Sequence, residues 1–335
     1  MPKLLIATDA WKPQINGVVR TLTNTISWLE NAGYTVEVIH PNLFRNVPCP
    51  FYSEIQLALP APGRIRKIVE KFEPDHIHIA TEGPIGLQLR RLCVKRGWNF
   101  TTSFHTRFPE YLQHLAKIPQ NWTWPLFRWF HGASSKIMAP SQSFADKLKQ
   151  LGFNNVDIWS RGIDLGQFAP REKNYPKTDR PILMYIGRIS KEKNVEAFLA
   201  AEAPGTKYLV GDGPIKKQLE KKYPDAKFLG YKTGEDLAQA YANADVFVFP
   251  SLTDTFGNVI LEALASGVPV AAFPATGPID ILVEPQYGCC DEDLSAAIKR
   301  ALDKGDPQAC VEYARTYTWE NASKQFAGYL VPHAA

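Results

Sequence analysis

Two carboxylates stand eight positions apart in the segment DTFGNVILEALASG, at Asp254 and Glu262. The surrounding sequence VFVFPSLTDTFGNVILEALASGVPVAAF reads as strand, loop, helix and strand, which puts Asp254 at the mouth of the helix and Glu262 inside it. Because apolar residues flank Glu262, its carboxylate either faces solvent or is buried with hydrogen-bond donors. Sugar and ribose hydroxyls are such donors, and one carboxylate can accept two of them. The alternative is an exposed helical glutamate with an N-capping aspartate.

Two basic residues, Arg188 and Lys193, flank the short loop GRISKEKN, which follows an apolar run and enters a helix. Two cations beside a helix N-terminus suit a diphosphate, although a solvated loop would also carry them. The first turn of the helix after Asp254 has free N–H groups and is a second candidate for phosphate binding. Its residues are Phe256, Gly257 and Asn258.

Glycines follow two other strand-like runs. Gly17 opens a helix after the first run, where it can let a ligand approach the backbone, although it equally fits a plain strand–helix turn. Gly211 lies in VGDGP (210–214), which we interpret as mainly a tight turn on the ligand side of the sheet. The loop at Gly17 is not GxGxxG, so a dinucleotide site is not supported.

The elements that must position these residues alternate between short apolar runs and helical stretches. This alternation predicts parallel sheets with helices on both faces, in which ligands bind beyond the carboxyl ends of the strands. Two such series occur on either side of the charged, aperiodic segment 169–181, so we predict two doubly wound domains, 1–170 and 181–317. The predicted strands are 3–9, 35–40, 76–80, 99–105, 136–140, 156–160, 182–187, 207–211, 227–230, 246–250 and 268–273.

Composition and length place the chain among globular proteins. Its 335 residues are 45% hydrophobic and 21% charged. Apolar runs stay well short of the roughly 18–20 residues of a membrane span, and the first residues do not read as a secretion signal. The five cysteines form no CxxC, which argues against a disulfide framework or zinc site and fits a reducing cytoplasm.

Positive charge gathers in the first half of the chain. Residues 1–170 hold 19 Lys and Arg against 12 Asp and Glu, whereas residues 171–335 hold 19 against 22. The aromatic and basic segment 117–136, with the basic stretches 63–72 and 90–98, suits the interface of an anionic membrane. The alternative is that these aromatic residues are core residues. Nucleic acid fits less well, because the basic runs are short and carry no RNA-binding signature.

Three histidines and an acidic triplet are the remaining candidates for catalysis or metal binding. His105 follows the predicted strand 99–105 and so lies at the ligand side of its sheet. His76 and His78 share one face of a strand, but a third zinc ligand is not evident. The triplet DED (291–293) is most simply an acidic helix start. We therefore predict no metal site.

Together these motifs resemble the retaining GT-B glycosyltransferases of family 4, and the resemblance covers nearly the whole chain. It is greatest to bacterial GDP-mannose-dependent α-mannosyltransferases and to relatives that glycosylate diacylglycerol. The order of the motifs makes the resemblance specific, although each alone is weak. They are IATDAWKPQINGVVRTL (6–22), IATEGPIG (79–86), SFHTRFPEY (103–111), APSQS (139–143), SRGID (160–164), YIGRISKEKN (185–194), VGDGP (210–214) and DTFGNVILEALASG (254–267).

The resemblance implies a role for each matched residue. Arg188 and Lys193 would neutralise the donor diphosphate, Asp254 would hold hydroxyls of the transferred sugar, and Glu262 would hold the ribose. His105 would lie close to the reacting sugar. Asp254 is a departure, because most of the family has Glu there, and a side chain one methylene shorter affects which sugar fits. Also implied are donor contacts from Gly17, Gly211, Phe256, Gly257 and Asn258, and an acceptor side with Asp9, Arg107 and Tyr111.

The resemblance further implies two Rossmann-like domains facing across a cleft, with a C-terminal helix (318–333) packing back on the first. The expected activity is metal-independent, cofactor-free transfer of a hexose from UDP- or GDP-hexose to a membrane lipid or lipid-linked glycan. A soluble acceptor, or a sugar-nucleotide epimerase or hydrolase on the same fold, is the alternative. We expect a cytoplasmic protein that contacts the inner face of the membrane reversibly and does not bind nucleic acid.

Overall fold

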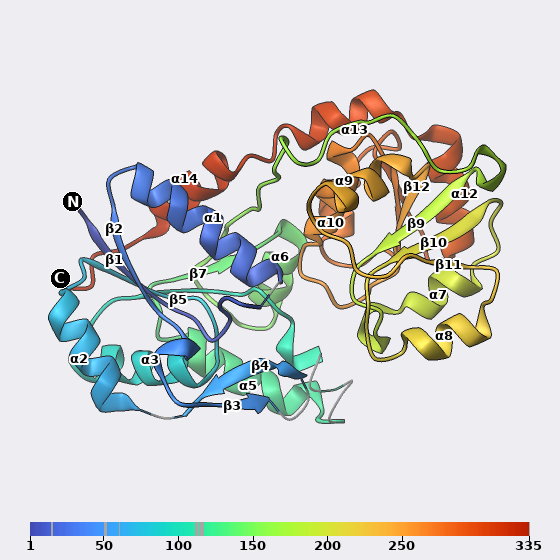
Figure 1. The fold of residues 1–335 in the computed structure, drawn as a ribbon. Coiled ribbons are helices and arrows are strands. Elements are labelled where there is room, and N and C mark those ends of the chain that lie inside the picture. Colours follow the sequence, from blue (N-terminus) through green and yellow to red (C-terminus); the bar gives the residue numbers. More distant parts are fainter. Residues whose placement is uncertain (15, 50–51, 60, 111–112, 114–116, 335) are drawn as a thin grey trace. The chain divides into compact units, whose positions relative to one another are not determined.

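The structure is a computed structural model that describes residues 1–14, 16–49, 52–59, 61–110, 113 and 117–334 (Figure 1). The chain forms two compact units. Unit 1 comprises residues 1–162 and the segment from Trp319 onward, and unit 2 comprises residues 163–318. The segment 169–181, expected to join two domains, lies inside unit 2, because the chain passes between the units at Gly162–Ile163 and at Thr318–Trp319.

Unit 1 is built on a parallel six-stranded sheet with the order β2-β1-β5-β6-β7-β8. The order reverses direction beside β1, as in other doubly wound sheets. Its strands all lie within segments that were predicted as strands from the sequence, although β6 consists of Thr and Ser. They are β1 (Lys3–Ala7), β2 (Thr35–Ile39), β5 (His76–Ile79), β6 (Thr101–Ser103), β7 (Lys136–Ala139) and β8 (Val156–Ile158).

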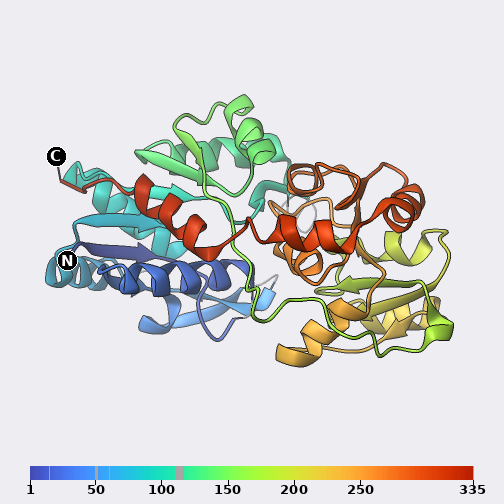
Figure 2. The ribbon, with the colours of Figure 1, turned by 90° about the horizontal axis from the view of Figure 1, so that it is seen from above.

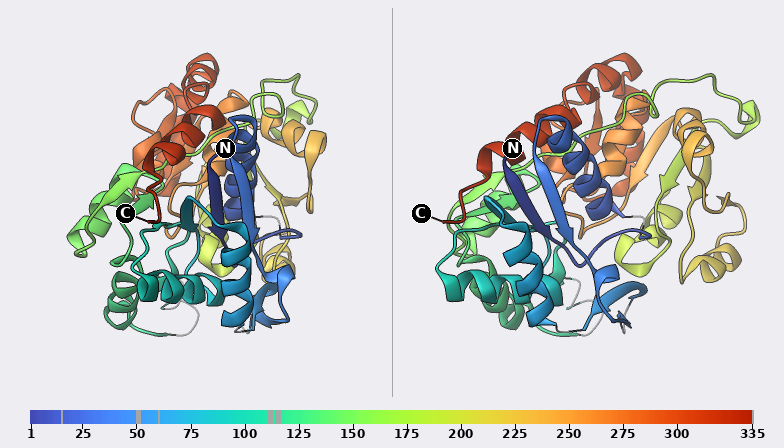
Figure 3. Two further views of the ribbon diagram at one scale, coloured as in Figure 1. Left: turned by 90° about the vertical axis from the view of Figure 1, so that its left-hand side faces the viewer. Right: turned by 60° about the vertical axis from the view of Figure 1, so that its left-hand side comes forward.

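Helices cover both faces of this sheet. Alternate residues of β1 separate the two cores, since Leu5 packs with α2, α3 and the end of α5, whereas Leu4 packs with α1 and α14. Figures 1 and 3 show α14, in red, alongside α1, in blue. The helices are α1 (Gly17–Asn31), α2 (Pro62–Phe72), α3 (Pro84–Arg96), α5 (Gln120–His131), α6 (Gln142–Gln150) and α14 (Trp319–Tyr329).

The last helix belongs to unit 1 although unit 2 precedes it in the chain. Its Phe326 is fully buried and packs against Trp159 at a ring-centroid distance of 4.7 Å. At the junction, a Cβ atom on Gly162 would come within 2.4 Å of the backbone nitrogen of Trp319, so this position requires glycine. The red C-terminal segment ends on unit 1, which also holds the N-terminus (Figure 2).

An antiparallel hairpin, β3 (Asn46–Cys49) with β4 (Tyr52–Ala58), follows the 3-10 helix η1 (Pro41–Leu43) in unit 1. The sequence did not predict it, because Pro48 and the mixed polar residues break the apolar-run pattern used for the other strands.

Unit 2 repeats the architecture with a parallel sheet of order β11-β10-β9-β12-β13-β14. All five side chains of β9 are buried, because helices cover the sheet on both faces. The strands are β9 (Ile182–Ile186), β10 (Thr206–Val210), β11 (Lys227–Phe228), β12 (Val246–Phe249), β13 (Val270–Ala272) and β14 (Gly288–Cys290). The last of these was not predicted. Two doubly wound parallel-sheet domains are nevertheless confirmed.

The helical segments of unit 2 connect these strands. They are η2 (Lys177–Asp179), η3 (Lys191–Lys193), α7 (Val195–Ala200), α8 (Lys216–Lys222), α9 (Gly234–Asn243), α10 (Asn258–Ala265), α11 (Pro278–Ile281), α12 (Leu294–Lys304) and α13 (Pro307–Ala314).

Candidate active site

The loops after β9 and β12 meet at the carboxyl end of the unit 2 sheet, where they bring Lys193 and Asp254 together. The Nζ atom of Lys193 lies 2.6 Å from Oδ1 of Asp254, and each side chain is 24% exposed. Two further contacts tie the same loops. The amide of Asn194 donates to the carbonyl of Pro250 at 3.2 Å, and the Thr253 hydroxyl donates to the carbonyl of Glu192 at 3.2 Å.

Arg188 lies in the same loop as Lys193, directly after β9. Its carbonyl accepts a 2.7 Å hydrogen bond from the hydroxyl of Tyr185, which fixes the backbone as the chain leaves the strand. Its side chain is half-buried. A guanidinium, an ammonium and a carboxylate therefore occupy the end of the unit 2 sheet where α/β proteins bind ligands.

Glu262 is buried, and Tyr241 is its partner. The side chain lies on α10, is 5% exposed, and accepts a 2.7 Å hydrogen bond from the Tyr241 hydroxyl at Oε2. The sequence allowed either an exposed glutamate or a buried one with a hydrogen-bond donor, and the structure shows the buried arrangement. The sequence could not identify Tyr241, because it comes from another helix and has no fixed spacing to Glu262.

The residues at the start of α10 differ in what they can offer a ligand. Phe256 is buried in the core, where its ring packs edge-on against that of Tyr317. Gly257 has a φ of +89°, which favours glycine, and Asn258 is half-buried. Gly211 is required by packing, because a Cβ atom there would lie 1.9 Å from the Gly187 carbonyl oxygen.

In unit 1, His105 belongs to a chain of hydrogen bonds that crosses the carboxyl end of the sheet. Its Nε2 atom lies 3.0 Å from the Ser103 hydroxyl, which lies 3.1 Å from Nε2 of His78. Its Nδ1 atom lies 3.4 Å from the guanidinium of Arg161. Burial, with the charges of Arg161 and His78, lowers the pKa of His105 well below its usual range, so the ring is neutral at pH 7.

Arg161 was not assigned a role from the sequence, although it lies in the quoted SRGID segment. It is 4% exposed, and its guanidinium donates to the carbonyls of Trp159 and Ser160 as well as approaching His105. Burial lowers the pKa of Arg161 to about 9, which leaves it charged at neutral pH.

The residues expected on the acceptor side make contacts within unit 1. Asp9 accepts hydrogen bonds from the backbone nitrogen of Ile85 at 2.9 Å, from that of Gly86 at 3.3 Å and from the Thr81 hydroxyl at 3.0 Å. It therefore ties β1 to the first turn of α3, and burial raises its pKa to about 6. Tyr111 lies outside the described residues.

Arg107 and Gly17 are the other site residues of unit 1 that the sequence predicted. Arg107 makes a double contact with Glu110 at 2.7 and 3.0 Å, and Lys147 joins the same carboxylate oxygen at 2.6 Å. Gly17 is the first residue of α1, whose N-cap Asn16 accepts hydrogen bonds from the next turn. The expected residues thus fall into a unit 1 set around the ends of β1 and β6 and a unit 2 set around the ends of β9, β10 and β12.

The residues considered for metal binding have protein partners. Nδ1 of His76 contacts the carbonyl of Val331, and both ring nitrogens of His78 contact hydroxyls. Asp293 caps α12, and Asp291 pairs with Arg300 at 2.8 Å. In the part of the chain that the structure describes, no three His, Cys, Asp or Glu side chains are grouped as metal ligands.

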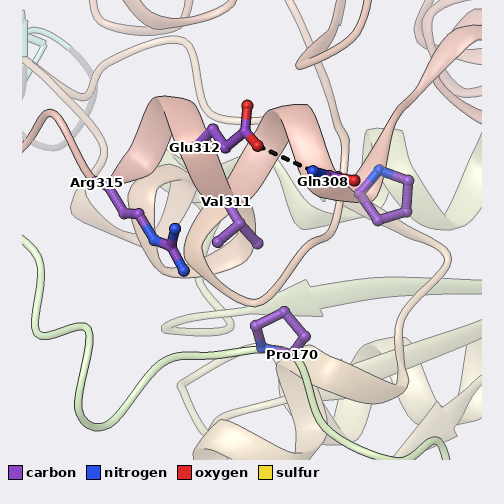
Figure 4. Close-up of a pocket in the computed structure, with 6 residues that line it drawn as sticks. Pro170, Gln308, Val311, Glu312 and Arg315 are labelled. Atoms are coloured by element: carbon purple, nitrogen blue, oxygen red, sulfur yellow. Dashed lines mark hydrogen bonds between the residues drawn. The ribbon is translucent and has the colours of Figure 1, made fainter.

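One cavity lies beside α13 in unit 2 and is separate from these residues. Figure 4 shows Pro170 below the helix, with a hydrogen bond between Gln308 and Glu312 on its upper side. The lining residues are Pro170, Pro307, Gln308, Val311, Glu312 and Arg315, which include none of the expected site residues.

The aromatic segment 117–136 divides between core and surface. On α5, Trp124, Phe127 and Phe130 are buried, so the core interpretation holds for them. Trp122, Leu126 and Trp129 recur at helical spacing on the opposite side and are 77%, 58% and 49% exposed. None of the helices in the described part of the chain combines the length and the apolar composition that a membrane span requires.

Both halves of the chain match family models of glycosyltransferases. Residues 15–167 match the model described as Glycosyltransferase Family 4, and residues 180–304 match that described as Glycosyl transferases group 1. The GDP-mannose-dependent alpha-mannosyltransferase of Mycobacterium tuberculosis is 30% identical over 85% of this chain and 82% of its own length.

Two further relatives carry the names of sugar transferases or glycolipid synthases, and one solved structure has a similar fold. The sulfoquinovosyl transferase of Arabidopsis thaliana is 30% identical over 85% of the chain, which spans 58% of that protein. The alpha-monoglucosyldiacylglycerol synthase of Streptococcus pneumoniae is 25% identical over 88% of the chain and 77% of its own length. The sucrose-phosphate synthase structure from Thermosynechococcus elongatus superposes with a TM-score of 0.79, at 19% identity and 98% coverage of both chains, which shows a shared fold.

Proposed function

Because the chain belongs to glycosyltransferase family 4, we propose that it transfers a hexose from a UDP- or GDP-hexose, with retention of configuration, to a membrane lipid or lipid-linked glycan. The contact between Lys193 and Asp254 carries this proposal. It puts a cation suited to phosphate beside an acceptor suited to sugar hydroxyls, which are the two chemistries of a nucleotide sugar.

The charges that develop during transfer explain why these residue types are needed. The bond between the sugar carbon and the diphosphate breaks, so negative charge builds on the leaving diphosphate and positive charge on the sugar carbon. Lys193 and Arg188 stabilise the leaving group, a role that needs no metal ion when protein cations supply the charge. Asp254 accepts hydrogen bonds from hydroxyls of the transferred sugar, and Glu262 accepts them from the ribose.

His105 has a positioning role in this proposal. Its two ring nitrogens face Ser103 and Arg161, so the ring is held in one orientation at the end of the unit 1 sheet. Because burial, with the charge of the neighbouring Arg161, lowers the pKa of His105, the side chain is a neutral imidazole rather than an imidazolium.

The surface of unit 1 supports a membrane lipid or lipid-linked glycan as the acceptor. The exposed stripe of Trp122, Leu126 and Trp129 lies on α5, whose end packs with α2 and α3 on one face of the sheet. Arg90 of α3 stacks on Trp129 at 3.8 Å. Exposed cations on α2 and α3 add positive charge, namely Lys67, Lys71, Arg91 and Lys95. Aromatic residues among cations suit shallow insertion into an anionic leaflet on the cytoplasmic side.

The activity is tested by release of nucleotide. The protein is incubated with GDP-mannose and with UDP-glucose, each with and without a membrane lipid extract. We expect nucleoside diphosphate to accumulate from one donor when the extract is present, together with a new glycolipid. Release that needs no acceptor would indicate a hydrolase, and a product that stays in the water phase would indicate a soluble acceptor.

Membrane contact is tested by sedimentation with vesicles of graded anionic lipid content. We expect binding that grows with anionic lipid, weakens at high salt, and falls when Trp122→Ala and Trp129→Ala are combined. Tyr231→Ala removes an aromatic side chain that is 59% exposed on unit 2 and serves as the control. Protein that stays in the supernatant at low salt with strongly anionic vesicles would overturn this part of the proposal.

A further inference from the structure

The contact between Tyr241 and Glu262 joins two buried side chains of unit 2. Tyr241 lies on α9 and is fully buried, and its hydroxyl donates to Oε2 of Glu262 on α10 at 2.7 Å. A buried carboxylate needs donors to remain charged, and a tyrosine hydroxyl supplies one without adding a positive charge.

Aromatic packing holds the tyrosine ring in place. Phe168 meets the ring edge-on at 5.5 Å and 88°, and Phe247 lies against it at 5.6 Å. Since the ring cannot swing away, the hydroxyl is presented to α10 in a fixed direction. A side chain held by packing and by a partner's hydrogen bond keeps a binding group in the geometry that a ligand requires.

We propose that Tyr241 is the positioning residue that orients the Glu262 carboxylate toward the 2′- and 3′-hydroxyls of the donor ribose, and so lets the enzyme select ribonucleotides over 2′-deoxyribonucleotides. This rests on the proposed function, in which Glu262 binds the ribose. A carboxylate offers about four acceptor positions, and the tyrosine uses one of them. The bond therefore fixes the carboxylate plane and leaves acceptor capacity for a diol.

The test measures nucleotide affinity, so it does not depend on knowing the acceptor. Calorimetry compares GDP with 2′-deoxy-GDP, and UDP with 2′-deoxy-UDP, on wild type and on Tyr241→Phe. A hydrogen bond to a charged group corresponds to a preference of about 10- to 100-fold, which we expect of the wild type. In Tyr241→Phe we expect the ribonucleotide to weaken and the preference to fall below about threefold.

The control is Tyr208→Phe. Tyr208 is also a buried tyrosine of unit 2 whose hydroxyl donates to a carboxylate, that of Asp179. Its loss should leave the preference unchanged, because a merely structural hydroxyl alters stability and not discrimination between sugars.

The possible outcomes distinguish the ribose-binding role of Glu262 from the positioning role of Tyr241. If the wild type binds ribonucleotides and 2′-deoxyribonucleotides equally well, Glu262 does not bind the ribose, and the role proposed for that residue is wrong. A wild-type preference that Tyr241→Phe keeps in full overturns the positioning role while leaving the proposed function standing. If Tyr241→Phe does not fold, Phe168→Leu tests the same contact, because it removes the edge-on ring that fixes the direction of the Tyr241 hydroxyl. A full ribose preference in that variant would also overturn the inference.

Discussion

Replacing Lys193 by Met removes the charge from the candidate diphosphate site and keeps a side chain of similar length. The lysine and Asp254 are each 24% exposed, so their ion pair is partly screened by solvent. Partly exposed pairs contribute about 0.2–1 kcal/mol to stability, and the free energy of unfolding should fall by no more than that. A group that stabilises the leaving diphosphate contributes much more to the reaction, typically about 10²–10³ in rate, or roughly 3–4 kcal/mol.

The two magnitudes differ enough for one variant to separate the roles. The assay measures acceptor-dependent release of nucleoside diphosphate for kcat and KM, and urea unfolding of the same preparation for stability. Lys191→Met is the matched control, because Lys191 is an exposed lysine on the same 3-10 helix. We expect Lys193→Met to lose at least 100-fold in kcat/KM with near-normal stability, and Lys191→Met to change by less than threefold.

A second comparison tests whether activity is lost only because Asp254 no longer has the ion pair with Lys193. If Lys193 serves only to neutralise that carboxylate, Asp254→Asn in the Lys193→Met background should restore turnover. If both residues contact the donor, the double variant stays at least 100-fold below wild type. Lys193→Met turnover within a factor of a few of wild type would refute the assignment of this lysine to the diphosphate.

Three further predictions follow from other parts of the structure. Burial raises the pKa of Asp9 to about 6 from the usual 3.8, so the folded chain binds this proton more tightly. Wild-type stability relative to Asp9→Asn should therefore rise by about 2 kcal/mol as pH falls from 6 to 4, measured by urea unfolding, and a flat difference would contradict it. Phe326→Ala should lower the free energy of unfolding by about 3–5 kcal/mol, seen first in unit 1, whereas a loss below about 1 kcal/mol would mean that α14 is dispensable. Activity should survive EDTA, and loss that Mg²⁺ or Mn²⁺ restores would show that a metal replaces the protein cations.

The sequence predicted the strands whose side chains are buried on both faces, because continuous apolar runs report such burial directly. It missed β14 (Gly288–Cys290), which is only three residues long, begins with a glycine and is held by pairing with β13. The boundary between the units was also placed several residues late. The aperiodic segment 169–181 is a surface connection within unit 2, whereas the true passage at Gly162–Ile163 has no change of composition.

For the candidate site, the sequence identified residue types that could do the chemistry but not their partners. Lys193 and Asp254 are 61 residues apart and meet because β9 and β12 are neighbours in the sheet. Buried Glu262 accepts its hydrogen bond from Tyr241 of another helix, and burial, with the charge of Arg161, lowers the pKa of His105. Such contacts depend on which strands pair and on how helices cross, and spacing along one chain does not contain that information.

The division of unit 1 into two chain segments has a consequence for how the protein is made. During synthesis, residues 1–162 leave the ribosome before unit 2, and the helix that carries Phe326 leaves it only after unit 2. Until then, Leu4, Ile6 and Trp159 lack a packing partner that later buries them. Unit 2 is contiguous and can close its cores earlier, although it starts later. A chain cut before α14 would therefore leave this apolar surface of unit 1 uncovered, so the fold of unit 1 depends on a helix that is made after unit 2.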